Sequence, residues 1–265
     1  MKYLRLLRYF LRILLYKRNM IIILLTFVVF HFVSFNFYNW QNAGPASLLI
    51  TFYYGPAYFN FDLLRWLLHQ TPIYVLCGNF LNKQLNENNL WILPRAGHFS
   101  LWLNGMISAN FIFIVIYYSI GYSISILLSY LINGGKSMSA SLDDIPLLNT
   151  YTPLKLMLFQ FVLLILLTFF IMLMSHVVSI LAGNSIAGFS ISVMFIFISV
   201  GLLQSSPYVN KWLPFSQGVL AARNVEVSPF AWSLSYYFFV IFMIMILFHY
   251  ICCKRMDSLL HKNTL

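Results

Sequence analysis

Charge is scarce in this sequence, and its scarcity excludes most classes of protein. Only 8% of the 265 residues are Asp, Glu, Lys or Arg, and none lies between Lys155 and Lys211. A soluble domain carries about 25% charged residues, so a water-soluble fold is excluded. The uncharged stretch is also much longer than the roughly 20 residues that cross a bilayer once, so the chain must turn back within it.

Motifs that carry chemistry are scarce as well. The 3 cysteines form no CxxC pair and the 6 histidines are scattered singly, so no metal site is expected. The stretch NGGKS around Lys136 is no phosphate-binding loop, because GxxxxGK[ST] needs a glycine where this chain has Tyr130. We therefore expect no catalytic residue and no cofactor bound by this chain.

Apolar side chains are what the sequence has in excess, at 61% of its residues and a mean hydropathy of +0.81. The apolar runs are continuous, which favours helices over the alternating strands of a membrane barrel. The sequence predicts an all-α membrane protein whose fourth and fifth spans form a hairpin turning at Gly183, Asn184 and Ser185. The six expected transmembrane helices cover residues 20–37, 63–81, 103–131, 154–181, 186–203 and 231–252.

Basic residues set the expected orientation. With both termini cytoplasmic, most of the 16 Lys and Arg residues lie on the inner side of a multi-pass protein in the cytoplasmic membrane. The net charge of +10 is explained by this placement, so no nucleic-acid partner is expected. The expected parts are a basic interfacial helix at 1–18, a membrane domain at 19–253 with a cytoplasmic segment at 82–102, and a tail at 254–265.

The first 18 residues form the clearest amphipathic pattern. Lys2, Arg5, Arg8 and Arg12 recur at helical spacing with leucines between them. Such a helix lies along the inner leaflet with Arg5, Arg8 and Arg12 among anionic lipid headgroups, which makes membrane lipids a partner. The alternatives are a simple flank that orients the first span, and a cleavable signal peptide. The apolar run at 20–37 is long for a signal peptide, and further spans follow it.

The expected outer segment at 38–62 is rich in aromatic residues and broken by Gly and Pro. Three interpretations stay open: an aromatic belt at the membrane interface, a lining for hydrophobic cargo, and a re-entrant dip of residues 47–54.

Five residues are candidates for a cargo pathway. Asp62, Arg65 and His69 share a helix face at spacings of three and four, and ionisable groups in a membrane are often functional, although near the interface they also snorkel. Tyr118 and Tyr122 place hydroxyl groups in the middle of the third span. These hydroxyls predict hydrogen bonds between helices or a polar lining.

Residues 82–102 form the substantial internal segment on the expected cytoplasmic side. Its sequence, NKQLNENNLWILPRAGHFSLW, suits a short interfacial helix around Leu90 and Trp91, broken by Pro94. An ordinary loop anchored by its tryptophans is the alternative. The other interpretation is a coupling element on which a soluble partner acts.

Together these features resemble the membrane subunit of type-two ATP-binding-cassette exporters, in which a cytoplasmic segment between spans two and three contacts the ATPase. The stretch from Leu81 to Trp102, with Glu87 ahead of Arg95, is similar to that of permeases associated with peptide or bacteriocin export and immunity. The resemblance implies that Glu87, Leu90, Trp91 and Arg95 belong to the ATPase-contacting segment. The long aromatic segment between spans one and two departs from the simplest members of the family.

The resemblance implies a permease subunit of an ATP-driven exporter, paired with a second copy or a paralogue. Separate ATPase subunits would hold ATP and Mg, so this chain is not itself an enzyme. Hydrophobic or amphipathic cargo, such as a peptide or a lipid-like molecule, suits the apolar interior. The alternatives are a membrane immunity or scaffold protein that transports nothing, and a membrane-embedded enzyme acting on lipid or peptide.

Overall fold

The computed structural model describes residues 2–37, 45–56, 61–86, 98–133, 147, 151–203, 210–222 and 229–262, and in these ranges it is helical without strands. The helices are α1 (Lys2–Leu14), α2 (Lys17–Phe37), α3 (Pro45–Tyr53), α4 (Phe61–Asn86), α6 (Phe99–Asn133), α7 (Pro153–Ala182), α8 (Ser185–Leu203), α10 (Pro214–Gly218), the short 3-10 helix η2 (Leu220–Ala222) and α11 (Phe230–Lys262).

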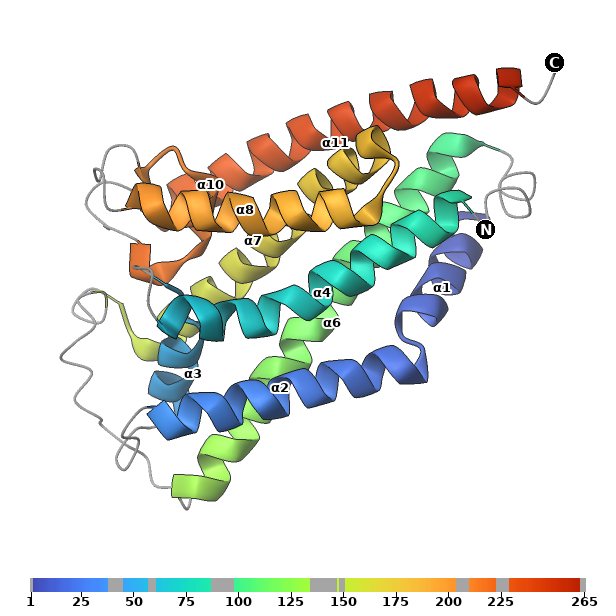
Figure 1. The fold of residues 1–265 in the computed structure, drawn as a ribbon. Coiled ribbons are helices and arrows are strands. Elements are labelled where there is room, and N and C mark those ends of the chain that lie inside the picture. The colour runs from blue at the N-terminus through green and yellow to red at the C-terminus, as the bar shows by residue number, and fades with distance from the viewer. Residues whose placement is uncertain are drawn as a thin grey trace.

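Among the described residues, 5 helices are long and apolar enough to cross a membrane: α2, α6, α7, α8 and α11. The chain is therefore an all-α, multi-pass membrane protein, as the composition predicts. The remaining expected span corresponds to α4, which has 26 residues and runs along the bundle beside α2 and α8 (Figure 1). It is about 39 Å long at 1.5 Å per residue, but its share of charged, amide and histidine side chains is larger than in the other long helices.

The core of the bundle is α7. It packs against α8, α11, α3, α10, α4 and α6, and 72% of its apolar span is buried, compared with 28% for α2, α8 and α11. A helix that is apolar on all sides needs protein or lipid all round it, and in α7 that surrounding is mostly protein. The first half of the uncharged stretch, α7, therefore forms the centre of the fold, whereas α8 lies at its periphery.

The two chain ends lie at the same end of the bundle, which we call the terminal end, and α3 and α10 lie at the opposite end, the far end (Figure 1). The hairpin between α7 and α8 turns at the terminal end, where the sequence predicts it. Gly183 adopts a φ of 70°, a left-handed conformation that suits glycine and ends α7. The Asn184 side chain then accepts a hydrogen bond of 2.9 Å from the Ile186 N–H and caps α8.

The basic N-terminal helix is amphipathic but shorter than expected. It ends at Leu14, where the Asn19 side-chain amide donates to the Leu14 carbonyl at 2.9 Å, and Lys17 begins α2. Phe10 is buried against the bundle, whereas Arg5, Arg8 and Arg12 are exposed. The predicted basic stripe is therefore present on α1.

At the far end, the segment after α3 meets the segment after α10. The Ala221 N–H donates to the Tyr54 carbonyl at 3.0 Å. Gly55 has a φ of 89°, and a β-carbon at this position would overlap the Val219 side chain. Glycine is therefore required there both for its backbone conformation and for the close approach of the two segments.

The tight contact of α8 with α7 at Gly188 generates a prediction, because a β-carbon there would overlap the Ser179 hydroxyl and the Ser175 carbonyl. We expect Gly188→Leu to lower the free energy of unfolding by about 1–3 kcal/mol, because the helices must separate. A thiol-reactive dye can report the unfolding temperature in detergent, since Cys77 and Cys252 are buried.

Gly78 supplies the matched control, because a β-carbon there would have no atom within 4 Å apart from its own helix and its chain neighbours. Gly78→Ala should leave stability unchanged or raise it by up to about 1 kcal/mol through helix propensity. An unfolding temperature for Gly188→Leu at or above that of Gly78→Ala would contradict the tight hairpin.

Candidate functional site

The candidate site is a polar layer inside the bundle, and it begins at α3. This helix has 9 residues, which at 1.5 Å each is too short to cross a bilayer. Its residues Leu49, Ile50, Phe52 and Tyr53 are nonetheless buried, packed on α6 and α7. The last carbonyls of a helix have no partner within it, so the end of α3 needs donors from elsewhere in the protein.

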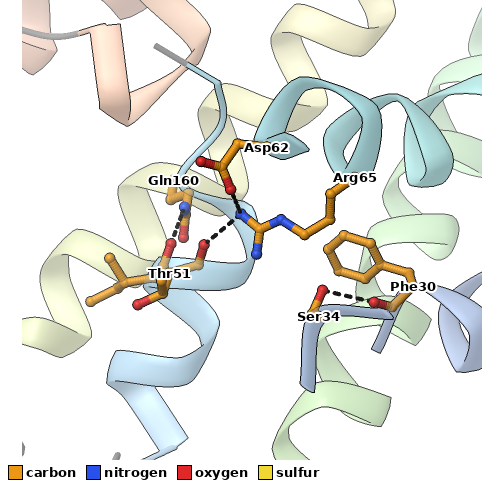
Figure 2. Close-up of polar contacts among 7 residues, drawn as sticks. Phe30, Ser34, Thr51, Asp62, Arg65 and Gln160 are labelled. Carbon is orange, nitrogen blue, oxygen red and sulfur yellow. Dashed lines mark hydrogen bonds and ion pairs between the residues drawn. The ribbon is translucent and has the colours of Figure 1, made fainter. Parts of the chain in front are cut away.

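Two polar side chains from other helices supply those donors (Figure 2). The Arg65 guanidinium of α4 donates to the Thr51 carbonyl at 3.4 Å, and the Gln160 amide of α7 donates to the Ile50 carbonyl at 3.0 Å. A cation is also favourable at a helix C-terminus, where the helix dipole is negative. These two contacts tie α3 to α4 and to α7.

The predicted pair of Asp62 and Arg65 forms. Arg65 Nη2 lies 3.2 Å from Asp62 Oδ1, and the side chains are 3% and 31% exposed. The same nitrogen contacts the Thr51 carbonyl, so Asp62 supports the cation that caps α3. Arg65 therefore caps the end of α3, a structural role that is separate from its predicted place in a cargo pathway.

A second polar cluster joins α4, α6 and α7 deeper in the bundle. The Gln70 amide donates to the Tyr118 hydroxyl at 2.5 Å, and the Gln70 carbonyl oxygen accepts from Tyr74 at 3.0 Å. The Tyr118 and Thr168 hydroxyls lie 2.6 Å apart, and Thr168 donates to Gln70 at 3.2 Å. All four side chains are buried, so the cluster satisfies its own hydrogen bonds inside the protein.

The other candidate residues lie around this cluster. Nε2 of His69, which is fully buried, lies 3.1 Å from the Gln70 amide nitrogen, and the His69 carbonyl accepts a hydrogen bond from Tyr117. Tyr122 donates to Gln160 at 3.4 Å and stacks on Tyr53. Hydrogen bonds between helices, one of the two roles predicted for the mid-span tyrosines, are therefore present. His69 and Tyr118 contact Gln70, Tyr122 contacts Gln160, and Asp62 and Arg65 lie at the Thr51 carbonyl, next to the Ile50 carbonyl that Gln160 contacts.

Gln70 and Gln160 were not singled out from the sequence as candidate residues. An amide side chain within an apolar run indicates a hydrogen bond between membrane helices, so both could have been found. A contact between His31 Nε2 on α2 and the Ser125 hydroxyl on α6 was also missed. A serine beside a histidine can form a nucleophile and base pair. Here the Ser125 hydroxyl also lies 2.8 Å from the Gly121 carbonyl and both side chains are fully buried, so the contact packs α2 against α6.

The aromatic residues of α3 lie in the core, which corrects the belt interpretation for two of them. Phe52 and Tyr53 are 1% and 0% exposed, and a belt residue would face the lipid interface. The Tyr53 ring packs against Phe30 with 5.6 Å between ring centres. The reason is that α3 folds into the bundle instead of lying along its surface.

The expected coupling residues Glu87, Leu90, Trp91 and Arg95 lie outside the described residues. The flanks of their segment are described, since α4 ends at Asn86 and α6 begins at Phe99.

Both flanks pack on α1. The Phe10 ring lies 5.8 Å from Phe80 of α4 and 6.2 Å from Trp102 of α6, measured between ring centres. The Tyr3 hydroxyl donates to Ser108 of α6 at 2.8 Å. The basic helix therefore touches the helix before the segment and the helix after it.

In comparisons with known proteins, the chain matches no family model, no curated protein and no solved structure. The functional argument therefore rests on the geometry of the chain itself.

The capping contact generates a prediction for Arg65. Arg65→Met keeps most of the side-chain length but removes a charged hydrogen-bond donor from the part-buried Thr51 carbonyl, which also accepts from the Tyr54 N–H at 3.4 Å. A hydrogen bond to a charged group contributes about 1.5–3 kcal/mol, so we expect the free energy of unfolding to fall by about that much at most. Arg65→Lys keeps the cation and should lose less. The measurement is the unfolding temperature in detergent. An Arg65→Met variant as stable as the wild type would contradict the capping role of Arg65.

Proposed function

We propose that this chain is the permease subunit of an ATP-driven exporter in the cytoplasmic membrane, with α4 as a sixth span and both termini in the cytoplasm. The length of α4 is sufficient to cross the roughly 30 Å hydrocarbon core. Its polar residues Arg65, His69 and Gln70 are buried in protein, so they need not meet lipid. A chain that crosses the membrane an even number of times has both ends on one side, and here both chain ends lie at the terminal end (Figure 1).

The observation that carries the proposal is the packing of α1 on both flanks of residues 82–102. Phe10 contacts Phe80 before this segment and Trp102 after it. A soluble ATPase that pushes on the segment would therefore move α1, α4 and α6 together. The exposed Arg5, Arg8 and Arg12 would hold α1 at the anionic surface of the inner leaflet while the spans tilt.

The cargo that suits this protein is hydrophobic or amphipathic, such as a peptide or a lipid-like molecule. A groove of about 490 Å³ lies between α4 and α8 and includes Leu67, Thr71 and Phe197. Pro72 follows Thr71 inside α4 and removes a backbone donor there, and Figure 1 shows that α4 bends along its length. A groove between helices beside a bend suits cargo that enters from the membrane.

In the proposed cycle, the polar layer is the closed barrier. Asp62, Arg65, His69, Tyr118 and Tyr122 would face the passage when α4 moves away from α6 and α7. A membrane dimer, formed with a second copy or a paralogue, would complete the passage. Two partner ATPases would bind ATP and Mg and hydrolyse the ATP.

Purification of the native complex from its own membranes tests the proposal. We expect an ATPase subunit to copurify and its hydrolysis to rise when cargo is present. A native complex with no ATP-binding partner and no stimulated hydrolysis would overturn the exporter and favour a membrane immunity or scaffold protein.

Coupling gives a sharper prediction on the same complex. Glu87→Ala and Arg95→Ala should retain membrane insertion and ATP hydrolysis while export falls at least tenfold, because the push on the segment is no longer transmitted. The measurement is export per ATP hydrolysed in proteoliposomes. Lys155→Ala, at the far end of the bundle, is the control and should leave that ratio unchanged. An unchanged ratio in the Glu87 and Arg95 variants would count against coupling through residues 82–102.

A further inference from the structure

A second groove, of about 420 Å³, runs between α6 and α11 and separates polar from apolar groups along its length. Because the two helices run in opposite directions, Asn104 near the start of α6 lies beside the late part of α11, which carries His249 and Tyr250. The rest of the groove is apolar. Its remaining lining residues are Ile107, Phe242, Met245 and Ile246.

The polar end of the groove lies at the level of the basic helix α1. The Tyr3 hydroxyl donates to Ser108, one helical turn from Asn104 on α6. A β-carbon at Gly105 would lie 3.5 Å from the Phe10 ring, so α1 packs directly against α6 beside Asn104. An amphipathic helix lies at the depth of the lipid headgroups. Asn104 is therefore at headgroup depth, and the apolar part of the groove extends towards the membrane interior.

The mouth of the groove is basic. Ile246, Tyr250 and Lys254 follow one another at intervals of four residues on α11, so the exposed Lys254 lies one turn beyond the groove on the same face. Lys2, also exposed, precedes the Tyr3 that bonds to α6. Lys2 and Lys254 therefore place exposed positive charge at the mouth of the groove, whereas Asp62, the acidic side chain that the structure describes, lies at the far end of the bundle.

We propose that the groove between α6 and α11 binds one phospholipid with an anionic headgroup, taken from the leaflet on the side of α1. The phosphate lies at Asn104 and His249, with Lys254 supplying positive charge. One acyl chain follows Phe242 and Ile246 into the membrane.

The first test compares two lipids that differ only in the headgroup. The full-length protein, stripped of lipid in a neutral detergent, is mixed with equal amounts of dioleoyl phosphatidylglycerol and dioleoyl phosphatidylcholine, and bound lipid is counted by native mass spectrometry. We expect about fivefold more of the anionic lipid, because a basic residue such as Lys254 near the surface contributes about 1 kcal/mol and a factor of ten corresponds to about 1.4 kcal/mol. The double variant His249→Ala, Lys254→Gln should bind the two lipids equally. Equal binding by the wild type would overturn the proposal.

The second test blocks the apolar part. Ile246→Trp fills the groove and should remove most binding of both lipids. Ile198→Trp on α8 is the matched control, since Ile246 and Ile198 are 52% and 50% exposed. Equal lipid binding by the two Trp variants would contradict the lipid site. Ile246→Trp could instead dissociate a dimer and leave lipid binding unchanged. This second result would also contradict the lipid site and would assign the groove to a second copy of the chain.

A photoactivatable phosphatidylglycerol tests the wild type without any variant. It should cross-link to a peptide of α11 around His249, and cross-linking spread evenly over α2, α8 and α11 would overturn the site. None of these measurements involves ATP. A failure of the lipid site therefore leaves the exporter proposal standing, and a failure of coupling leaves the lipid site standing.

Discussion

The end of α3 sets the constraint on which the polar interior depends. A helix that stops inside a membrane protein leaves carbonyl groups that lipid cannot satisfy, so the protein must provide the donors. Here Arg65 and Gln160 provide them, from α4 and α7 (Figure 2). Placing a guanidinium in this position in turn requires Asp62 beside it. A short buried helix thus explains why otherwise apolar helices carry these polar residues.

The same rule accounts for the composition of α4. Two of its polar side chains bond to neighbouring helices: Arg65 to α3, and Gln70 to Tyr118 of α6 and Thr168 of α7. Buried groups that satisfy each other avoid the cost of meeting lipid, so α4 can be less apolar than its neighbours and still lie within the bundle. Hydropathy alone treats such residues as if they faced lipid, and it therefore underrates a helix whose polar face is covered by protein.

Features that depend on nearby residues could be predicted from the sequence. The apolar runs predicted the long helices, and Gly183 and Asn184 predicted the hairpin turn. The spacing of three residues predicted the ion pair of Asp62 and Arg65. The contacts that define the site join distant positions. Gln160 and Ile50 are 110 residues apart and His31 and Ser125 are 94 apart, and no local pattern relates them. The burial of α3 follows from these long-range contacts, so the sequence left three interpretations open.

In the proposed cycle, α4 is the route by which a push at one end reaches the other. Its half at the terminal end contacts α1 through Phe80, and its half at the far end bonds to α3 through Arg65, with Pro72 between the two halves. Beyond α3, the Tyr54 carbonyl accepts a hydrogen bond from the Ala221 N–H, which joins the segment after α3 to the segment after α10. A tilt of the half of α4 at the terminal end therefore strains the Gln70 cluster first and the cap on α3 next. The barrier would open from the ATPase side outward, an order that suits export of cargo taken up on the inner side.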